Sequence, residues 1–469
     1  MHLRHSIAAA CLPLLLAACA TPDLPNAASV APQQWHAPLP HNGNVRDLSQ
    51  WWQQQGDPLL AQLVEAAQAA SPSIASARAR IEDARATRVA AGAALLPTLD
   101  AAASASRSSA QPPQPMGTTA QAGLQTSWEI DVFGAGRAAR QAAQARLESA
   151  TAGWHDARVS VAAEVANQYY AWRACERLLS IVTADAASRA ETSRLADLSE
   201  RAGFQAPATA ALARASAAEG NARATQQRAQ CDIDIKALVA LTGMAEPELR
   251  QKLAASTASA EVPLAIASLP LQVLAQRPDV FAAERALLAA AAEVGGAQAQ
   301  RLPRLSLNGS VGRAYFRSGG IDGDMSSWSI GPLALSLPVF DGGRRAANVD
   351  AARARYDEAV AAYQAGIRRA VREVEEALVN LHSTAARSED ARIAVDGYRA
   401  SFNATEARYK GGLASLVELE ESRRTRLAAE NALVSLERER RAAWIALYRA
   451  AGGGWQAPDA AAVAADQRR

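Results

Sequence analysis

Two cysteines in the interior of the chain are spaced so that they could form a disulfide bond. Cys175 and Cys231 each lie 28 residues from Gly203 (203 − 175 and 231 − 203). If the chain turns back at Gly203 as an antiparallel pair of helices, the two thiols lie side by side. We therefore predict a disulfide across this hairpin, because the start of the chain indicates export to an oxidising compartment. Two buried free thiols are the alternative.

The start of the chain has the pattern of an export signal. A short apolar run, 7–18, follows a basic start and ends directly before Cys19. It is too short for a permanent membrane span, so we expect 1–18 to be a signal peptide. The small residues before Cys19 resemble the lipobox of bacterial lipoproteins, whose cysteine receives a diacylglycerol, and Ala20 then points to the outer membrane. An ordinary signal peptide with a chance cysteine is the alternative.

No pattern in the sequence indicates catalysis, a metal or a cofactor other than this covalent lipid. The six histidines are scattered without metal-ligand spacing. No glycine-rich phosphate loop follows a strand and no nucleophile elbow is present. The net charge of +2 at pH 7 gives no reason to expect a nucleic-acid partner. We expect a protein that is not an enzyme.

Short motifs recur along the chain at an almost constant offset, which indicates an internal duplication. The offset lies between 206 and 209 residues (303 − 97 and 412 − 203). The repeated motifs are Leu-Pro at 96–97 and 302–303, Phe-Gly-Ala-Gly-Arg at 133–137 and Phe-Asp-Gly-Gly-Arg at 340–344, and the glycines at 203 and 412. We expect a lipidated segment at 19–56, a first repeat at 57–246, a linker at 247–270, a second repeat at 271–453 and a tail at 454–469.

Each repeat predicts one helix, two strands and a long helical hairpin. The helices are expected at 58–95 and 271–301, the strands at 99–106, 123–133, 305–311 and 328–340, and the long helices at 137–200 and 344–410, with partners returning to 243 and 452. Asp57-Pro58 is a typical helix start. Each long helix would measure about 100 Å. Their seams repeat apolar residues at steps of three, four or seven, as in coiled coils.

The strand segments alternate apolar and polar residues over about ten positions, which is typical of membrane barrel strands. A soluble hairpin with one wet face is the alternative. The last segment changes its alternation at Gly331-Pro332, which predicts a bulge. The joining segments, 107–119 and 316–327, are rich in Pro, Gly and Ser and are expected to be loops at the far end of the sheet.

The string Arg277-Pro278-Asp279-Val280 and the motif at 340–344 resemble those of the outer membrane factor family, the TolC-like proteins, and within it the lipoprotein efflux branch (OprM/NodT-like). The resemblance covers essentially the whole mature chain. It implies an α+β membrane protein in which three protomers give four strands each to a 12-stranded outer-membrane β-barrel. A long periplasmic α-helical barrel continues that barrel.

The resemblance also implies the function. The chain would be the outer-membrane channel of a tripartite (RND-type) efflux system, passing drugs or other small molecules outward. Its expected partners are two further copies, outer-membrane lipid, a periplasmic adaptor and an inner-membrane pump. A type I protein-secretion duct and a non-channel coiled-coil envelope lipoprotein are the alternatives. The tryptophans at 51, 52 and 455 are expected outside the helices, packing at the equator of the tunnel.

In TolC-like proteins acidic side chains just past the second helix turn surround the periplasmic mouth. Glu418 and Glu421 match those positions, and their spacing of three puts both carboxylates on one helical face. Three copies would stack two rings of carboxylates that favour cations. The sequence departs from the pattern in having Glu in place of Asp, and the alternative is that Glu420 and Glu421 only solvate a surface helix. The helix turns are expected at Gly203, Gly411 and Gly412.

Overall fold

The computed structural model describes residues 51–54, 56–109, 116–256, 274 and 276–455. The predicted signal peptide and lipidated Cys19 therefore lie outside the described residues. Within the described part, no helix has a segment that is both long enough and apolar enough to cross a membrane.

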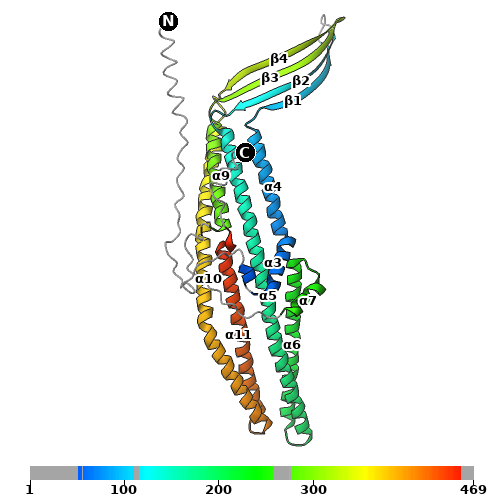
Figure 1. Cartoon of the computed structure of the whole chain (residues 1–469), viewed down its shortest axis with the longest axis vertical. Coiled ribbons are helices and arrows are strands. Elements are labelled where there is room, and N and C mark those ends of the chain that lie inside the picture. The colour runs from blue at the N-terminus through cyan, green and yellow to red at the C-terminus, as the bar shows by residue number, and fades with distance from the viewer. Residues whose placement is uncertain (1–50, 55, 110–115, 257–273, 275, 456–469) are drawn as a thin grey trace. The chain divides into compact units, whose positions relative to one another are not determined.

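The order of elements repeats once, as the duplication predicts (Figure 1). A helix, two strands, a helix of 67 residues and a shorter returning helix occur in each half. In chain order the elements are α2 (Trp51–Gln54), α3 (Pro58–Ala70), α4 (Pro72–Ala93), β1 (Thr98–Ser108), β2 (Gly117–Ile130), α5 (Ala135–Arg201), α6 (Pro207–Thr242), α7 (Glu246–Ala255), α9 (Pro278–Ala299), β3 (Arg304–Ser318), β4 (Ile321–Ser336), α10 (Arg344–Lys410), α11 (Leu416–Ala450) and the short 3₁₀ helix η4 (Gly452–Gly454).

The compact units of the chain cut across these repeats. One unit contains Arg78–Ala152 and Ala282–Gly366, and so takes the sheet and neighbouring helical segments from both halves. The rest of the described chain forms the second unit. Because α5 and α10 each contribute to both units, neither repeat is a compact body of its own.

The first predicted helix is in fact two helices. Asp57 caps α3 by accepting a hydrogen bond from the backbone N–H of Leu59 (3.1 Å), which confirms the predicted start. The chain then leaves the helix at Ser71, whose backbone is extended. Pro72 follows, and a proline disfavours helical geometry in the residue before it. The predicted single helix at 58–95 is therefore wrong at this one position.

The four strands form one antiparallel sheet in the order β1-β2-β3-β4. The predicted loop at 316–327 is wrong, because β3 and β4 are joined by Gly319 and Gly320 alone. Both glycines have positive φ (60° and 85°), as a two-residue hairpin turn requires. The predicted loop at 107–119 is also too long, since pairing extends to Ser108 and Gly117. Small polar residues in these segments resemble a loop in sequence but continue the ladder.

The register separates the residues of the sheet by face, since directly paired residues point the same way. The predicted bulge is confirmed by a register shift between Leu307 and Gly309, opposite Gly331 and Pro332. One face, here called the apolar face, carries Leu99, Leu124, Trp128, Ile130, Leu305, Leu307, Val311, Trp328, Ile330, Leu333 and Leu335 near the helices. The other, here called the polar face, carries Gln121, Gln125, Ser127, Glu129, Ser306, Ser310, Ser327 and Ser329.

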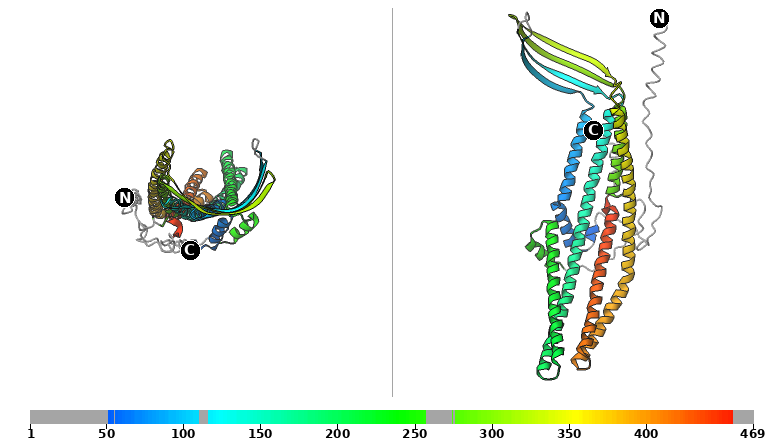
Figure 2. Two further views of the ribbon diagram at one scale, coloured as in Figure 1. Left: turned by 90° about the horizontal axis from the view of Figure 1, so that it is seen from above. Right: turned by 180° about the vertical axis from the view of Figure 1, so that it is seen from behind.

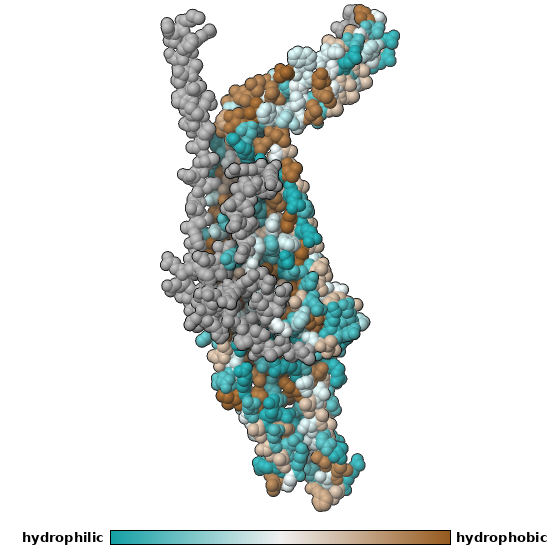
Figure 3. Space-filling model, in the orientation of Figure 1, coloured by the Kyte–Doolittle hydropathy of each residue, from teal (hydrophilic) through white to brown (hydrophobic). Residues whose placement is uncertain are grey.

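The sheet is curved (Figure 2), and its hydrophobic residues gather toward the helices while hydrophilic residues gather at the far end (Figure 3). A curved sheet with one apolar face is what a membrane-facing wall requires.

The core of the second unit is built around aromatic side chains. Trp51 stacks on Tyr448 with ring centroids 4.8 Å apart, and Trp52 meets the same ring edge-on. Trp51 and Trp52 lie in α2, so the expectation that they stand outside the helices is wrong. Both side chains are buried. Trp455 follows η4 and contacts Phe281 at 5.2 Å between ring centroids.

Candidate gate and docking tips

The two long helices end in turns of the same construction. Gly203 and Gly412 take positive φ values of 77° and 74°. In each turn the next backbone N–H reaches back five residues, from Phe204 to the carbonyl of Ser199 and from Leu413 to that of Arg408. This is the glycine-terminated helix end. Of the two glycines expected at the second turn, Gly412 takes the left-handed conformation.

Each turn exposes one large apolar side chain. Phe204 is 86% exposed and Leu413 is 74% exposed, although both are hydrophobic. They occupy equivalent places, directly after the left-handed glycine. Exposed apolar groups at the tip of a structure, repeated in both halves, are typical of an interaction surface.

Glu418 caps the start of α11. Its carboxylate accepts hydrogen bonds from the backbone N–H (2.7 Å) and the hydroxyl (3.0 Å) of Ser415. The Ser415 hydroxyl in turn accepts from the N–H of Glu418, which completes a capping box. The bond from the Ser415 backbone, then that from its hydroxyl, hold the pKa of Glu418 below its ordinary value. Glu418 therefore has a structural role in addition to any gate.

Glu421 lies on the same exposed side of α11, opposite the buried seam of Leu416, Leu419 and Arg423. The side chain of Glu418 is 53% exposed and that of Glu421 is 59% exposed. Arg424 forms an ion pair with Glu421 and holds the pKa of this carboxyl below its ordinary value. Both carboxylates are therefore ionised at neutral pH, and both lie on the exposed side of α11.

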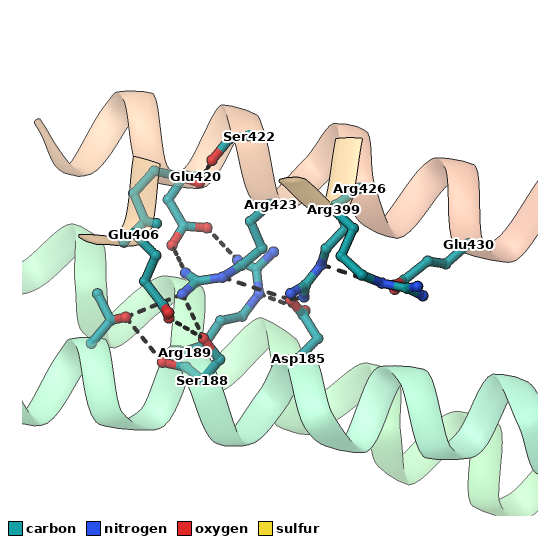
Figure 4. A network of polar contacts seen from close by, with 12 residues as sticks. Asp185, Ser188, Arg189, Arg399, Glu406, Glu420, Ser422, Arg423, Arg426 and Glu430 are labelled. Atoms are coloured by element: carbon teal, nitrogen blue, oxygen red, sulfur yellow. Dashed lines mark hydrogen bonds and ion pairs between the residues drawn. The ribbon is translucent and has the colours of Figure 1, made fainter. Parts of the chain in front are cut away.

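Behind this face, buried ion pairs join the two helical hairpins (Figure 4). Glu420 of α11 pairs with Arg189 of α5 and with Arg423, whose side chain has 0% exposure. Arg189 also pairs with Asp185 at 2.7 Å. Arg423 donates to Ser188 (3.0 Å) on α5. These contacts connect α5 and α11 through charged side chains.

Two small apolar clusters border this network and keep water from it. One contains Phe402, Leu416 and Leu419, and the other contains Val182 and Leu427. The guanidinium of Arg426 lies 3.9 Å from the ring centroid of Phe402. Burial, the largest effect, lowers the pKa of Arg423 from its ordinary value, but an arginine keeps its charge. The network therefore consists of ionised side chains in a largely buried site.

Sequence reasoning found the exposed carboxylates and missed the buried ones. The alternative in which Glu420 only solvates a surface is wrong, since Glu420 bonds to two arginines. Asp185 and Arg189 were not identified at all. Their spacing of four residues, a favourable helical ion pair, was the available signal, but many such pairs occur along these helices.

The structure brings the two interior cysteines together. Cys175 of α5 and Cys231 of α6 lie with Sγ atoms 2.07 Å apart and Cα atoms 5.5 Å apart. Both side chains are buried. The bond is placed in the hairpin that also supplies Asp185 and Arg189.

The Arg-Pro-Asp-Val string forms a joint between helices. Arg277 pairs with Asp279 and with Glu373 of α10, each at 2.7 Å, and donates to the carbonyl of Ala450 at 3.1 Å. The Arg277 side chain is buried. The string therefore positions the start of α9 against α10 and the end of α11. Among the described residues, no group of three His, Cys, Asp or Glu side chains is arranged to hold a metal.

The chain matches the model of a protein family described as "Outer membrane efflux protein" over residues 63–244 and again over 269–453. It is 30% identical to the solvent efflux pump outer membrane protein SrpC of Pseudomonas putida, over 85% of this chain and 86% of SrpC.

Solved structures of outer-membrane proteins agree with this family match. The outer-membrane channel OprN superposes with a TM-score of 0.83 at 28% identity, over 93% of this chain and 99% of OprN. The outer membrane protein VceC of Vibrio cholerae gives 0.76 at 29% identity, over 87% of this chain and 99% of VceC.

Proposed function

This chain belongs to the outer membrane efflux protein family and is an outer-membrane channel that serves an efflux pump, and we propose that three copies form one continuous duct with a carboxylate gate. The channel is not an enzyme. The observation that carries the proposal is the sheet of four strands. Among the described residues, β1 and β4 have a partner on one side only. Four strands are too few to close a barrel, and three copies supply twelve.

The faces of the sheet support this closure. In a membrane wall the apolar face contacts lipid and the polar face lines the passage. Every large aliphatic residue of the sheet near the helices lies on one face, and the opposite face carries Ser, Gln and Asn. A soluble hairpin buries its apolar face against other elements, whereas here Ile330 and Leu335 are exposed.

The tips support docking of a periplasmic adaptor, which couples the channel to an inner-membrane pump. Phe204 and Leu413 offer matching apolar contacts at both turns, and three copies would present six. Cross-linking from a photoreactive residue placed at Phe204 should capture the adaptor in cells. Cross-linking only to a second copy of the channel would contradict adaptor docking there.

The lipid anchor remains a proposal based on the sequence around Cys19. A diacylglycerol on this sulfur would hold the N-terminus at the membrane surface but could not replace a spanning structure. Mass measurement of the N-terminal peptide tests it. A peptide that begins before Cys19, or that carries no lipid, would contradict it.

The substrates are proposed to be drugs and other small, largely apolar molecules. This rests on the relative SrpC, which is described as part of a solvent efflux pump. No described feature favours folded proteins as cargo. Deleting the gene should lower the tolerated concentration of such compounds, and unchanged tolerance to solvents and drugs alike would contradict this substrate class.

The gate is proposed to be two rings of carboxylates from Glu418 and Glu421. Both side chains are exposed, both have lowered pKa values, and both lie opposite the seam that packs α11 onto its own protomer. A ring of three negative charges attracts cations and repels anions. Arg424 partly offsets each Glu421 charge, so we expect moderate cation preference.

Planar bilayers test the channel and the gate together. The wild-type protein should form pores whose reversal potential in a salt gradient indicates cation preference. Glu421→Gln should reduce that preference, and Glu418→Gln should reduce it further in the double variant. Glu439→Gln is the matched control. Glu439 is an exposed acid on α11, like Glu418 and Glu421, and it pairs with Arg387 of α10. No pores would contradict the channel, and unchanged selectivity in the double variant would contradict the gate.

A further inference from the structure

The apolar face of the sheet changes character at its far end. Beyond the aliphatic residues it carries three arginines, Arg107 on β1 and Arg313 and Arg317 on β3. The register puts them on the same face as Leu124 and Val311. On the polar face at this end of the sheet, the described residues include no arginine or lysine. The basic groups are therefore placed on the side that is proposed to meet lipid.

The position of these arginines along the strand fits the edge of a membrane. Arg313 lies eight positions and Arg317 twelve positions beyond Leu305 on β3 (313 − 305 and 317 − 305). At about 3.4 Å per residue and a tilt of about 40°, these are roughly 21 Å and 31 Å along the membrane normal. The apolar band of such walls is about 25 Å tall. Arg313 thus falls at its edge, and Arg317 falls in the head-group layer.

The ion pairs follow this division. Arg313, the arginine nearest the apolar band, is neutralised by Asp324 at 2.6 Å. Arg317 has no ion pair or hydrogen bond with any described residue. Asp322, its cross-strand neighbour, instead accepts from the hydroxyl of Tyr315 at 3.5 Å. Among the described residues, the Arg107 side chain donates only to the sulfur of Met116, a weak acceptor.

Arg107 and Arg317 lie in one lateral row of the sheet. Arg107 pairs with Thr118 and Thr118 pairs with Arg317. Two strand spacings of about 4.8 Å separate the arginines by roughly 10 Å, so both side chains can reach one group between them. The adjoining segment 110–115 contains only Ala, Gln and Pro, so it supplies no carboxylate to neutralise them.

From this row we infer that Arg107, Thr118 and Arg317 bind a phosphate-bearing lipid head group of the outer leaflet. The planar guanidinium matches phosphate oxygens in a two-pronged contact, and the threonine hydroxyl adds one donor. The lipid holds the far end of each protomer's sheet at a fixed depth. The inference rests on the proposed orientation of the apolar face toward lipid.

The test uses full-length protein in detergent, titrated with phosphatidylglycerol, an anionic lipid with a phosphate group. Bound lipid per protomer is counted by native mass spectrometry. Each arginine near a membrane surface changes the affinity for an anionic lipid roughly fivefold, so Arg107→Gln with Arg317→Gln should weaken binding about 25-fold. Added salt should weaken wild-type binding in the same way.

Matched variants separate the outcomes. Arg304→Gln changes an exposed arginine on the same strand, at the end near the helices and outside the row, and should bind lipid as the wild type does. Arg107→Lys with Arg317→Lys keeps the charge and should bind lipid more tightly than the double glutamine variant. Equal lipid binding by the double glutamine variant and the wild type would overturn the inference, as would displacement of the lipid by inorganic phosphate at millimolar concentration.

Pore formation by the same preparations distinguishes failure of the head-group site from failure of the channel. If the wild type forms pores and the double glutamine variant binds lipid unchanged, only the head-group site is wrong. If the wild type forms no pores, the channel itself is wrong.

Discussion

Arg423 lies inside the protein with none of its side chain exposed, although it carries a charge. Its partners Glu420 and Asp185 are also largely buried. Replacing Arg423 with leucine would leave these carboxylates with less compensation, and removing one partner of a buried pair costs about 3–5 kcal/mol. We expect Arg423→Leu to lower the melting temperature of the detergent-solubilised protein, followed by circular dichroism.

The next residue provides the control. Arg424 makes an ion pair of the same spacing with Glu421, but in solvent, where such pairs contribute less than about 1 kcal/mol. Arg424→Leu should melt close to the wild type. If both variants lose the same stability, the network behind the gate is not the buried contact described here.

The capping carboxylate of Glu418 predicts a dependence on pH. Its pKa in the folded chain lies below the ordinary value of 4.5, so the unfolded chain takes up the proton first as pH falls. The stabilising contribution is complete above pH 4.5 and is lost as pH falls through the folded pKa. We expect thermal stability to decline below pH 4.5 less steeply in Glu418→Gln, whose amide can still cap but cannot titrate. Parallel pH profiles would contradict this.

At the scale of single residues, the sequence predicts what local spacing determines. The equal sequence separations of Cys175 and Cys231 from Gly203 are enough to predict that the two cysteines pair. Local spacing does not predict the burial of Arg423. This residue is next to Arg424 in a run of charged residues that is typical of a solvated helix surface. Whether an arginine of α11 is buried or exposed depends on which neighbouring helix packs against that side of α11. The sequence of one helix does not show which helix that is.

A disulfide bond joins the two helices of the α5–α6 hairpin. The two cysteines are 56 residues apart in sequence, and closing such a loop restricts the unfolded chain by about 4 kcal/mol in the entropic description. We expect the Cys175→Ser, Cys231→Ser variant to unfold at lower temperature, and reduction of the wild type to reproduce the shift. Non-reducing peptide mapping that finds two free thiols would contradict the bond.

The long helices were predictable because their apolar seams repeat over many turns. The strands were predictable in number and facing, since period-two alternation is a backbone property. Their ends were not. Residues 316–327 hold a Gly-Gly pair and several small polar residues that resemble a loop, yet pairing runs to Ser318 and resumes at Ile321. A ladder continues where its partner strand continues, and that partner is set by the fold.

At the scale of the whole molecule, exposed apolar residues on the outer helices support assembly. Such residues occur on α10 and α6, namely Val379, Ile393, Tyr398 and Ile233. We expect Ile393→Asp to shift the detergent-solubilised protein from three copies toward one, measured by light scattering, because the interface would then bury a charge. Arg392→Asp places the same acid one position away and should stay trimeric. A wild-type protein of single-copy mass would contradict the trimer.

The efflux-channel function inferred from the motifs is confirmed by the family to which the chain belongs. The division of the chain could not be predicted in the same way. Repeats are visible in sequence as recurring motifs, whereas compact units depend on contacts between segments far apart, such as Arg78–Ala152 with Ala282–Gly366.

The pairing of β2 with β3 has a consequence for how the protein is made. Gly117 pairs with Ser318, 201 residues later (318 − 117). During export the first hairpin therefore emerges with an open edge and waits for its third strand while two long helices are delivered. A lone two-stranded hairpin is marginally stable, and an open edge invites pairing with other chains. The sheet is therefore completed late in synthesis, and the free edge of β2 stays open to other strands until β3 follows.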